Sequence, residues 1–77
     1  MKEGSKVKLT PTDIASEEFR QSVAKLGEVT GEVAAVSNIG VCTVIVCSDV
    51  NIPGHTHPLN SDSNYLDIHQ DHLTVIE

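Results

Sequence analysis

The chain has 77 residues and a formal net charge of −6, with 39% hydrophobic residues, one Phe, one Tyr and no Trp. This length fits one domain with an aliphatic core, and the acidic balance disfavours a protein that clamps phosphates by itself, because nonspecific nucleic-acid affinity comes mainly from Lys and Arg. No apolar run approaches the ~18 residues of a membrane span and the first ten residues lack the apolar core of a signal peptide, so we expect a cytoplasmic protein without a membrane segment.

The first expected element is a strand over Lys6–Thr10, in which Val7 and Leu9 alternate with polar residues. Pro11 ends this strand. A short helix or a set of irregular turns is expected between Asp13 and about Ala24.

The helix has two possible starts. Thr10 and Pro11 form one start signal, and Ser16 followed by two Glu residues forms another. Gly27 is expected to end the helix. The alternative is a long excursion loop whose Phe19 tucks into the core.

Residues 27–48 hold the densest apolar run and predict a β-hairpin. Two β-branched runs, 28–36 and 41–47, flank a turn that contains Asn38 and Gly40. The second run is continuous, which indicates a strand covered on both faces or lying at the centre of a barrel. Gly31 inside a strand pattern indicates a bulge, a sharp bend or a close backbone approach, or simply a strand start. The members expected in the core are Val29, Val33, Val44, Val46, Leu66 and Leu73.

The two cysteines, Cys42 and Cys47, fall five residues apart in one expected strand. They therefore point to opposite faces, roughly 17 Å apart at ~3.3 Å per residue, and cannot form a disulfide with each other. Both are interpreted as small buried hydrophobic residues in a reducing compartment.

The segment 49–64 is expected to be a long loop, because it combines two Pro, one Gly and many turn-forming side chains. A short strand over 65–68, a single helical turn over 69–72 and a closing strand over 73–76 follow. The chain is therefore predicted to be an all-β, five-stranded small barrel with a helical excursion after its first strand, forming one domain over residues 1–77.

The chain resembles the small SH3-like barrels of the KOW type, which include stand-alone short proteins of phages and bacterial mobile elements. Four stretches carry the resemblance. GSKVKLT is similar to the first strand of that group and LGEVTGEVAAV to the KOW segment. VCTVIV followed by YLDIHQDHLTVIE is similar to its third strand and its ending, in which a one-turn 3₁₀ helix precedes the last strand. The resemblance implies an SH3-like barrel. Nucleic-acid-binding members are usually basic around the motif, whereas Glu28 and Glu32 flank it here.

The first functional hypothesis is a non-enzymatic protein-interaction module without a cofactor. It would contact an unknown protein partner through the loop 49–64 and an acidic face. The candidate partner-binding residues are His55, His57, Tyr65 and Asp67. Tyr65 either anchors the loop or sits on a binding face. The chain is expected to be a monomer or a small homo-oligomer.

The alternative is a KOW-type RNA- or DNA-binding domain, which the net charge of −6 disfavours. All five basic residues lie in the first 25 positions, and the seven acids from Leu26 onward have no Lys or Arg among them. The candidate nucleic-acid contacts are Lys6, Lys8, Arg20 and Lys25.

A third, weaker hypothesis is a histidine metal site. His55 and His57 form an H-x-H pair, and His69 and His72 form an H-x-x-H pair. Imidazole suits Zn, Cu or Ni, but the two pairs would combine only if the loop folded back onto the final turn. Surface histidines in a polar region are the simpler interpretation, and no metal ligand and no catalytic residue is assigned.

Overall fold

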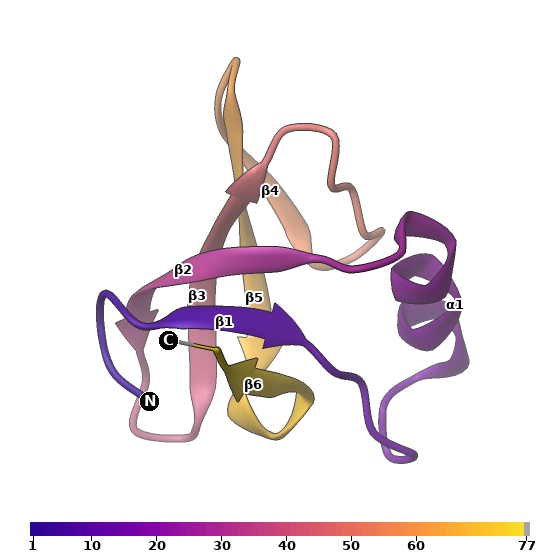
Figure 1. The fold of residues 1–77 in the computed structure, drawn as a ribbon, viewed down its shortest axis with the longest axis horizontal. Coiled ribbons are helices and arrows are strands. Elements are labelled where there is room, and N and C mark those ends of the chain that lie inside the picture. The colour runs from indigo at the N-terminus through magenta and orange to yellow at the C-terminus, as the bar shows by residue number, and fades with distance from the viewer. Residues whose placement is uncertain (77) are drawn as a thin grey trace.

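One six-stranded antiparallel sheet forms the framework of the computed structural model, which describes residues 1–76 (Figure 1). The elements in chain order are β1 (Lys6–Leu9), α1 (Glu17–Leu26), β2 (Thr30–Val36), β3 (Val41–Cys47), β4 (Thr56–Asn60), β5 (Ser63–His69), the 3₁₀ helix η1 (Gln70–His72) and β6 (Leu73–Val75). The strand order is β4-β5-β3-β2-β1-β6. The sheet is strongly bent, so that β1 and β2 cross β3 and β5 in Figure 1. No helix among the described residues is long and apolar enough to cross a membrane.

The expected five-stranded closed barrel is wrong in two respects. The sheet has six strands, and within residues 1–76 it does not close, because β4 and β6 lie at its two ends. The additional strand is β4, which lies inside the segment expected to be a loop. It pairs with β5 from the residue pair Thr56 and Leu66 to the pair Asn60 and Ser63. Pro58 lies in β4, and an edge strand tolerates a proline because one side of its backbone makes no ladder bonds.

The strands β2 and β3 approach each other closely at Gly31. A Cβ atom at this position would lie 2.6 Å from the carbonyl oxygen of Ile45 and 2.6 Å from Cγ1 of Val44. The close backbone approach expected from the sequence is therefore confirmed. The β-bulge of this hairpin lies elsewhere, between Val33 and Ala35.

One face of the sheet forms an aliphatic core, and the expected core residues are all buried. The buried set is completed by residues of β1, the β1–α1 connection, α1, β3, the β3–β4 connection and β5: Val7, Leu9, Ala15, Phe19, Val23, Cys42, Ile52 and Ile68. Along β3, buried residues alternate with partly exposed ones. The interpretation that this strand is covered on both faces is therefore wrong.

The two cysteines lie on opposite faces of β3, as the odd spacing predicts. Cys42 is fully buried, and its thiol lies 3.4 Å from the thioether sulfur of Met1. Cys47 is exposed at the strand end. The expectation that both are buried is wrong for Cys47, because only every second side chain of β3 faces the core.

The helix α1 begins after Ser16, at the second of the two sequence signals. The Ser16 side chain accepts a hydrogen bond from the Phe19 backbone N–H at 3.2 Å, which caps the helix. Phe19 and Val23 point into the core, and Gly27, with φ of 85°, follows the last turn as expected.

The connection from β3 to β4 is fixed by two buried side chains. Ile52 is fully buried. Asn64 at the start of β5 donates from its amide to the carbonyl oxygens of Ser48 and Val50, at 3.1 and 3.0 Å. These bonds tie the connection to β5, so the segment expected to be a long loop is largely ordered by its neighbours.

Candidate binding face

A single row of side chains crosses five strands on the face of the sheet opposite the core. We call it the outer row, and it consists of Lys6, Glu32, Ile45, Tyr65 and His57. The strand register places these residues directly opposite one another, Lys6 with Glu32, Glu32 with Ile45, Ile45 with Tyr65 and Tyr65 with His57. Directly opposed residues of antiparallel strands project to the same face. The row therefore presents an ion pair, an aliphatic side chain, a phenol and an imidazole side by side.

The carboxylate of Asp67 lies beside the outer row and is held from two sides. Thr43 of β3 donates its hydroxyl to Oδ1 at 3.2 Å, and Nε2 of His57 on β4 lies 3.1 Å from Oδ2. Both His57 and Asp67 remain about half exposed, at 58% and 49% of their side-chain areas. The contacts fix the carboxylate on the surface while leaving part of it accessible to a partner.

Three of the four candidate partner-binding residues therefore come together, and His55 does not join them. The His55 ring packs edge-on against Phe19 with 5.1 Å between ring centroids. Its Nδ1 lies 3.1 Å from the backbone carbonyl oxygen of Asp67, to which it donates. His55 thus contributes to the packing of α1 against the sheet.

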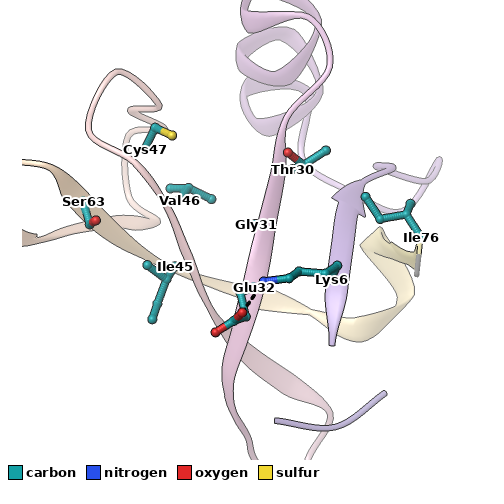
Figure 2. A pocket seen from close by; sticks show the side chains of 9 residues that line it. All are labelled: Lys6, Thr30, Gly31, Glu32, Ile45, Val46, Cys47, Ser63 and Ile76. Carbon is teal, nitrogen blue, oxygen red and sulfur yellow. Dashed lines mark hydrogen bonds and ion pairs between the residues drawn. The ribbon is translucent and has the colours of Figure 1, made fainter. Parts of the chain in front are cut away.

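A groove of about 410 Å³ adjoins the outer row where β2 separates from β3 (Figure 2). The pairing of β2 with β3 ends at Glu32–Ile45, whereas β3 continues to pair with β5 as far as Cys47–Ser63. The ends of β2 and β3 therefore form the two arms of a fork. The residues that line it are Lys6, Thr30, Gly31, Glu32, Ile45, Val46, Cys47, Ser63 and Ile76.

The sequence analysis did not identify this groove as a site. Its aliphatic members belong to apolar strand runs that predict only core. The signal that could have found it is Gly31, because a glycine within a strand marks a bend at which two paired strands can separate.

The candidate nucleic-acid contacts do not form one basic patch. Lys6 forms an ion pair with Glu32, and Lys8 lies 3.6 Å from Glu28, so both lysines of β1 face carboxylates of β2. Arg20 and Lys25 lie on α1, apart from β1 (Figure 1). Each lysine charge on the sheet is therefore offset locally.

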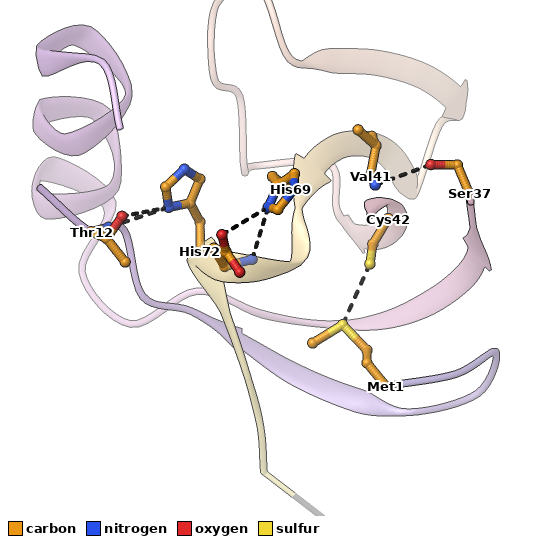
Figure 3. Close-up of polar contacts among 8 residues, drawn as sticks. Met1, Thr12, Ser37, Val41, Cys42, His69 and His72 are labelled. Carbon is orange, nitrogen blue, oxygen red and sulfur yellow. Dashed lines mark hydrogen bonds and ion pairs between the residues drawn. The ribbon is translucent and has the colours of Figure 1, made fainter. Parts of the chain in front are cut away.

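The four histidines do not assemble into a metal centre. Within residues 1–76, no group of three or more His, Cys, Asp or Glu side chains is arranged to hold a metal ion. The Nδ1 atoms of His55, His69 and His72 have other partners. Thr12 donates its backbone N–H to Nδ1 of His72 at 3.3 Å, and Asp71 donates its backbone N–H to Nδ1 of His69 at 3.1 Å (Figure 3).

Comparison with known protein families, with curated proteins and with solved structures finds no match.

Proposed function

We propose that this protein is a non-enzymatic protein-interaction module that contacts its partner through the outer row, Asp67 and the strand β4. The observation that carries the proposal is the outer row itself. It joins the exposed His57 and the partly exposed Tyr65 to the aliphatic Ile45 on one continuous surface. Tyr is among the residues enriched at protein interfaces, because its ring supplies apolar area and its hydroxyl supplies a hydrogen bond.

The rigidity of this surface favours recognition. Its side chains stand on paired strands, so little backbone order has to be gained on binding. A standard interface covers roughly 800 Å² of each partner. That is about a sixth of the 4675 Å² of accessible surface of this chain. The outer row, Asp67 and the groove between the ends of β2 and β3 are together suited to supply such an area.

The fold that we propose is an open SH3-like sheet of the KOW type with β4 as an added edge strand. The order of elements supports it, since a first strand, a helical excursion, a long hairpin, a strand, a 3₁₀ turn and a last strand follow one another. The one-turn η1 directly before β6 matches the ending on which the resemblance is based. A KOW-type nucleic-acid role is the weaker alternative, because Glu32 and Glu28 face the β1 lysines.

The test is a pull-down from lysate of the source organism with the tagged chain, with and without nuclease. Tyr65→Ala and His57→Ala are compared with the native chain. Gln21→Ala serves as a matched control because Gln21 is exposed on α1, where its amide donates to the Glu17 carboxylate on the same helix. We expect a stoichiometric protein that survives nuclease and is lost, by at least tenfold, with the two outer-row variants but not with the control.

Two results would contradict the proposal. Capture that disappears with nuclease and depends on Lys8 or Arg20 would support the nucleic-acid alternative. Capture that is equal for all four chains would remove the outer row from the interface. Far-UV circular dichroism of each variant shows whether a loss reflects unfolding.

A further inference from the structure

We infer that a cavity between α1 and the sheet binds a small uncharged molecule with an apolar body and an amide-type head, in which a C=O group lies beside an N–H group. The cavity has a volume of about 260 Å³, and His55, His69 and His72 line it together with Phe19. The inference does not depend on the proposed function, because Phe19 and Ile68 of this cavity belong to the core side of the sheet, whereas the outer row lies on the opposite face.

The floor of the cavity is apolar. Phe19 and Ile68 are both buried members of the hydrophobic core. Ile14 lines the cavity as well and is 79% exposed. A molecule that covers Ile14 and fills the cavity removes apolar surface from water. Because pockets for drug-sized ligands occupy about 300–1,000 Å³, a cavity of about 260 Å³ suits a molecule with a single ring.

A hydrogen bond to the backbone decides which nitrogen of the His55 ring carries the proton. Nδ1 of His55 lies 3.1 Å from the backbone carbonyl oxygen of Asp67, and a carbonyl oxygen only accepts. Nδ1 therefore carries the hydrogen. Since a neutral imidazole has one N–H group, Nε2 of His55 is a hydrogen-bond acceptor.

The His72 ring carries its proton on the other nitrogen. Thr12 donates its backbone N–H to Nδ1 of His72 at 3.3 Å, and a backbone N–H only donates. The Thr12 hydroxyl, 3.1 Å from the same nitrogen, is a second donor. Nε2 of His72 therefore carries the hydrogen, and Figure 3 shows this nitrogen on the side of the ring away from Thr12.

The two imidazoles thus offer one acceptor and one donor at the same cavity. Both rings pack against Phe19, with ring centroids 5.1 and 5.9 Å from its centroid. An amide head satisfies both, since its C=O accepts from Nε2–H of His72 and its N–H donates to Nε2 of His55. A carboxylate brings no hydrogen for His55, and a metal ion finds no lone pair on Nε2 of His72. The net charge of −6 also disfavours an anion.

The proton positions are measured first, on the full-length native chain. Two-bond ¹H–¹⁵N NMR correlation of the histidine rings, at about pH 8.5 where imidazole is neutral, distinguishes the two tautomers. His55 is expected to carry its proton on Nδ1 and His72 on Nε2. The opposite tautomer at either ring overturns the inference.

Benzamide is the binding probe, because it joins one apolar ring to an amide head. It is expected to shift the NMR signals of Phe19, His55 and His72 saturably, with a Kd on the order of 10 mM or tighter for a molecule of its size. N,N-dimethylbenzamide lacks the N–H group, and benzoate is an anion. Each is expected to bind roughly three- to tenfold more weakly, which is the effect of one lost hydrogen bond.

Two variants test the imidazoles separately. His55→Phe and His72→Phe each keep an aromatic ring beside Phe19 and remove the ring nitrogens, so the affinity for benzamide should fall roughly three- to tenfold. His57→Phe is the matched control, since His57 belongs to the outer row.

Three results overturn the inference. They are equal binding of the three probes to the native chain, unchanged affinity of His55→Phe for benzamide, and saturable shifts of the three histidines of the cavity by Zn²⁺ alone. The comparison of the probes uses only the native chain and therefore decides the inference even where a variant fails to fold. Partner capture that depends on Tyr65 is a separate readout, so either proposal can fail while the other stands.

Discussion

Replacement of Gly31 by Ala is the change that most directly tests the account of the fold. Gly31 lies in β2 at the point where this strand leaves β3, and its backbone φ is not in the left-handed region. Only space therefore opposes a side chain here. The added Cβ would lie 2.6 Å from the Ile45 carbonyl oxygen and from Cγ1 of Val44, and 2.9 Å from Cγ1 of Val46.

The expected magnitude follows from which neighbours can move. The valine side chains are packed in the core, and the Ile45 carbonyl belongs to the backbone of a strand that pairs on both sides. Overpacking costs about 1–3 kcal/mol, and a flexible neighbour would reduce this cost. Because a backbone atom is the nearest neighbour, we expect a loss in the upper half of the range, about 2–3 kcal/mol in the free energy of unfolding.

Urea denaturation followed by far-UV circular dichroism measures this loss, and a thermal scan provides a second value. At about 4–8 °C per kcal/mol for a domain of this size, Tm should fall by about 8–24 °C. A double-mutant cycle with Val44→Ala is the matched control, since that change removes one of the two 2.6 Å contacts and should make Gly31→Ala less costly. If Gly31→Ala is as stable as the native chain, the close approach of β2 and β3 is wrong.

Four further predictions concern the buried polar and apolar groups and the two thiols. Asn64→Ala leaves two backbone carbonyls of the β3–β4 connection without their hydrogen-bond donor, so the free energy of unfolding measured in urea should fall by about 1–3 kcal/mol. A loss below about 0.3 kcal/mol would show that Asn64 does not anchor that connection. Ile52→Ala should cost about 2–5 kcal/mol because the side chain is fully buried, and unchanged stability would place this segment outside the core. Burial raises the pKa of Cys42, so native protein should react with a thiol reagent at Cys47 alone, and mass spectrometry would disprove this by finding two adducts without denaturant. The raised pKa means that the folded state favours the protonated Cys42 thiol. This contribution to stability is fully present below the thiol pKa of the unfolded chain and is lost as the pH rises through the raised pKa of the folded chain. Cys42→Ala should therefore flatten the decline in Tm at alkaline pH.

The sequence predicted the parts of the fold that depend on local pattern. The hairpin of β2 and β3, the one-turn helix before β6 and the burial of Val33 and Val44 follow from β-branched runs and turn residues. Local signals also explain the start of α1, where Ser16 offers an oxygen to a free N–H of the first turn. Of the two start signals in the sequence, the one followed directly by two acids is used.

The strand β4 could not be predicted in this way. Its sequence, THPLN, contains Pro58 and four side chains that are exposed or polar, and such a segment has no alternation to mark it. It is a strand because β5 offers a free edge and because Ile52 and Asn64 bring the preceding connection onto the sheet. These are tertiary causes, which a local pattern does not contain.

The candidate site was predicted in its members and not in its arrangement. His57 drew attention as a polar residue in the segment expected to be a loop, and Tyr65 and Asp67 as polar residues of the short strand expected after it. Their proximity depends on the register of β4 with β5, which pairs His57 with Tyr65 and which no residue in the sequence specifies. The resulting contact between His57 and Asp67 could therefore be found only in the folded chain.

The fork links the core to the candidate binding face through one strand. Val29, directly before β2, and Val33 of β2 are buried on one face, while Thr30 and Glu32 line the groove on the other. The absence of a side chain at Gly31 lets β2 approach the core of β3 and then turn away toward β1, and this turn is what opens the groove. The geometry that completes the core is thus also the geometry that leaves two strand edges apart. A change to a β2 side chain on the face opposite the core, such as Thr30 or Glu32, should therefore alter binding with little effect on stability. A change at Gly31 should alter both.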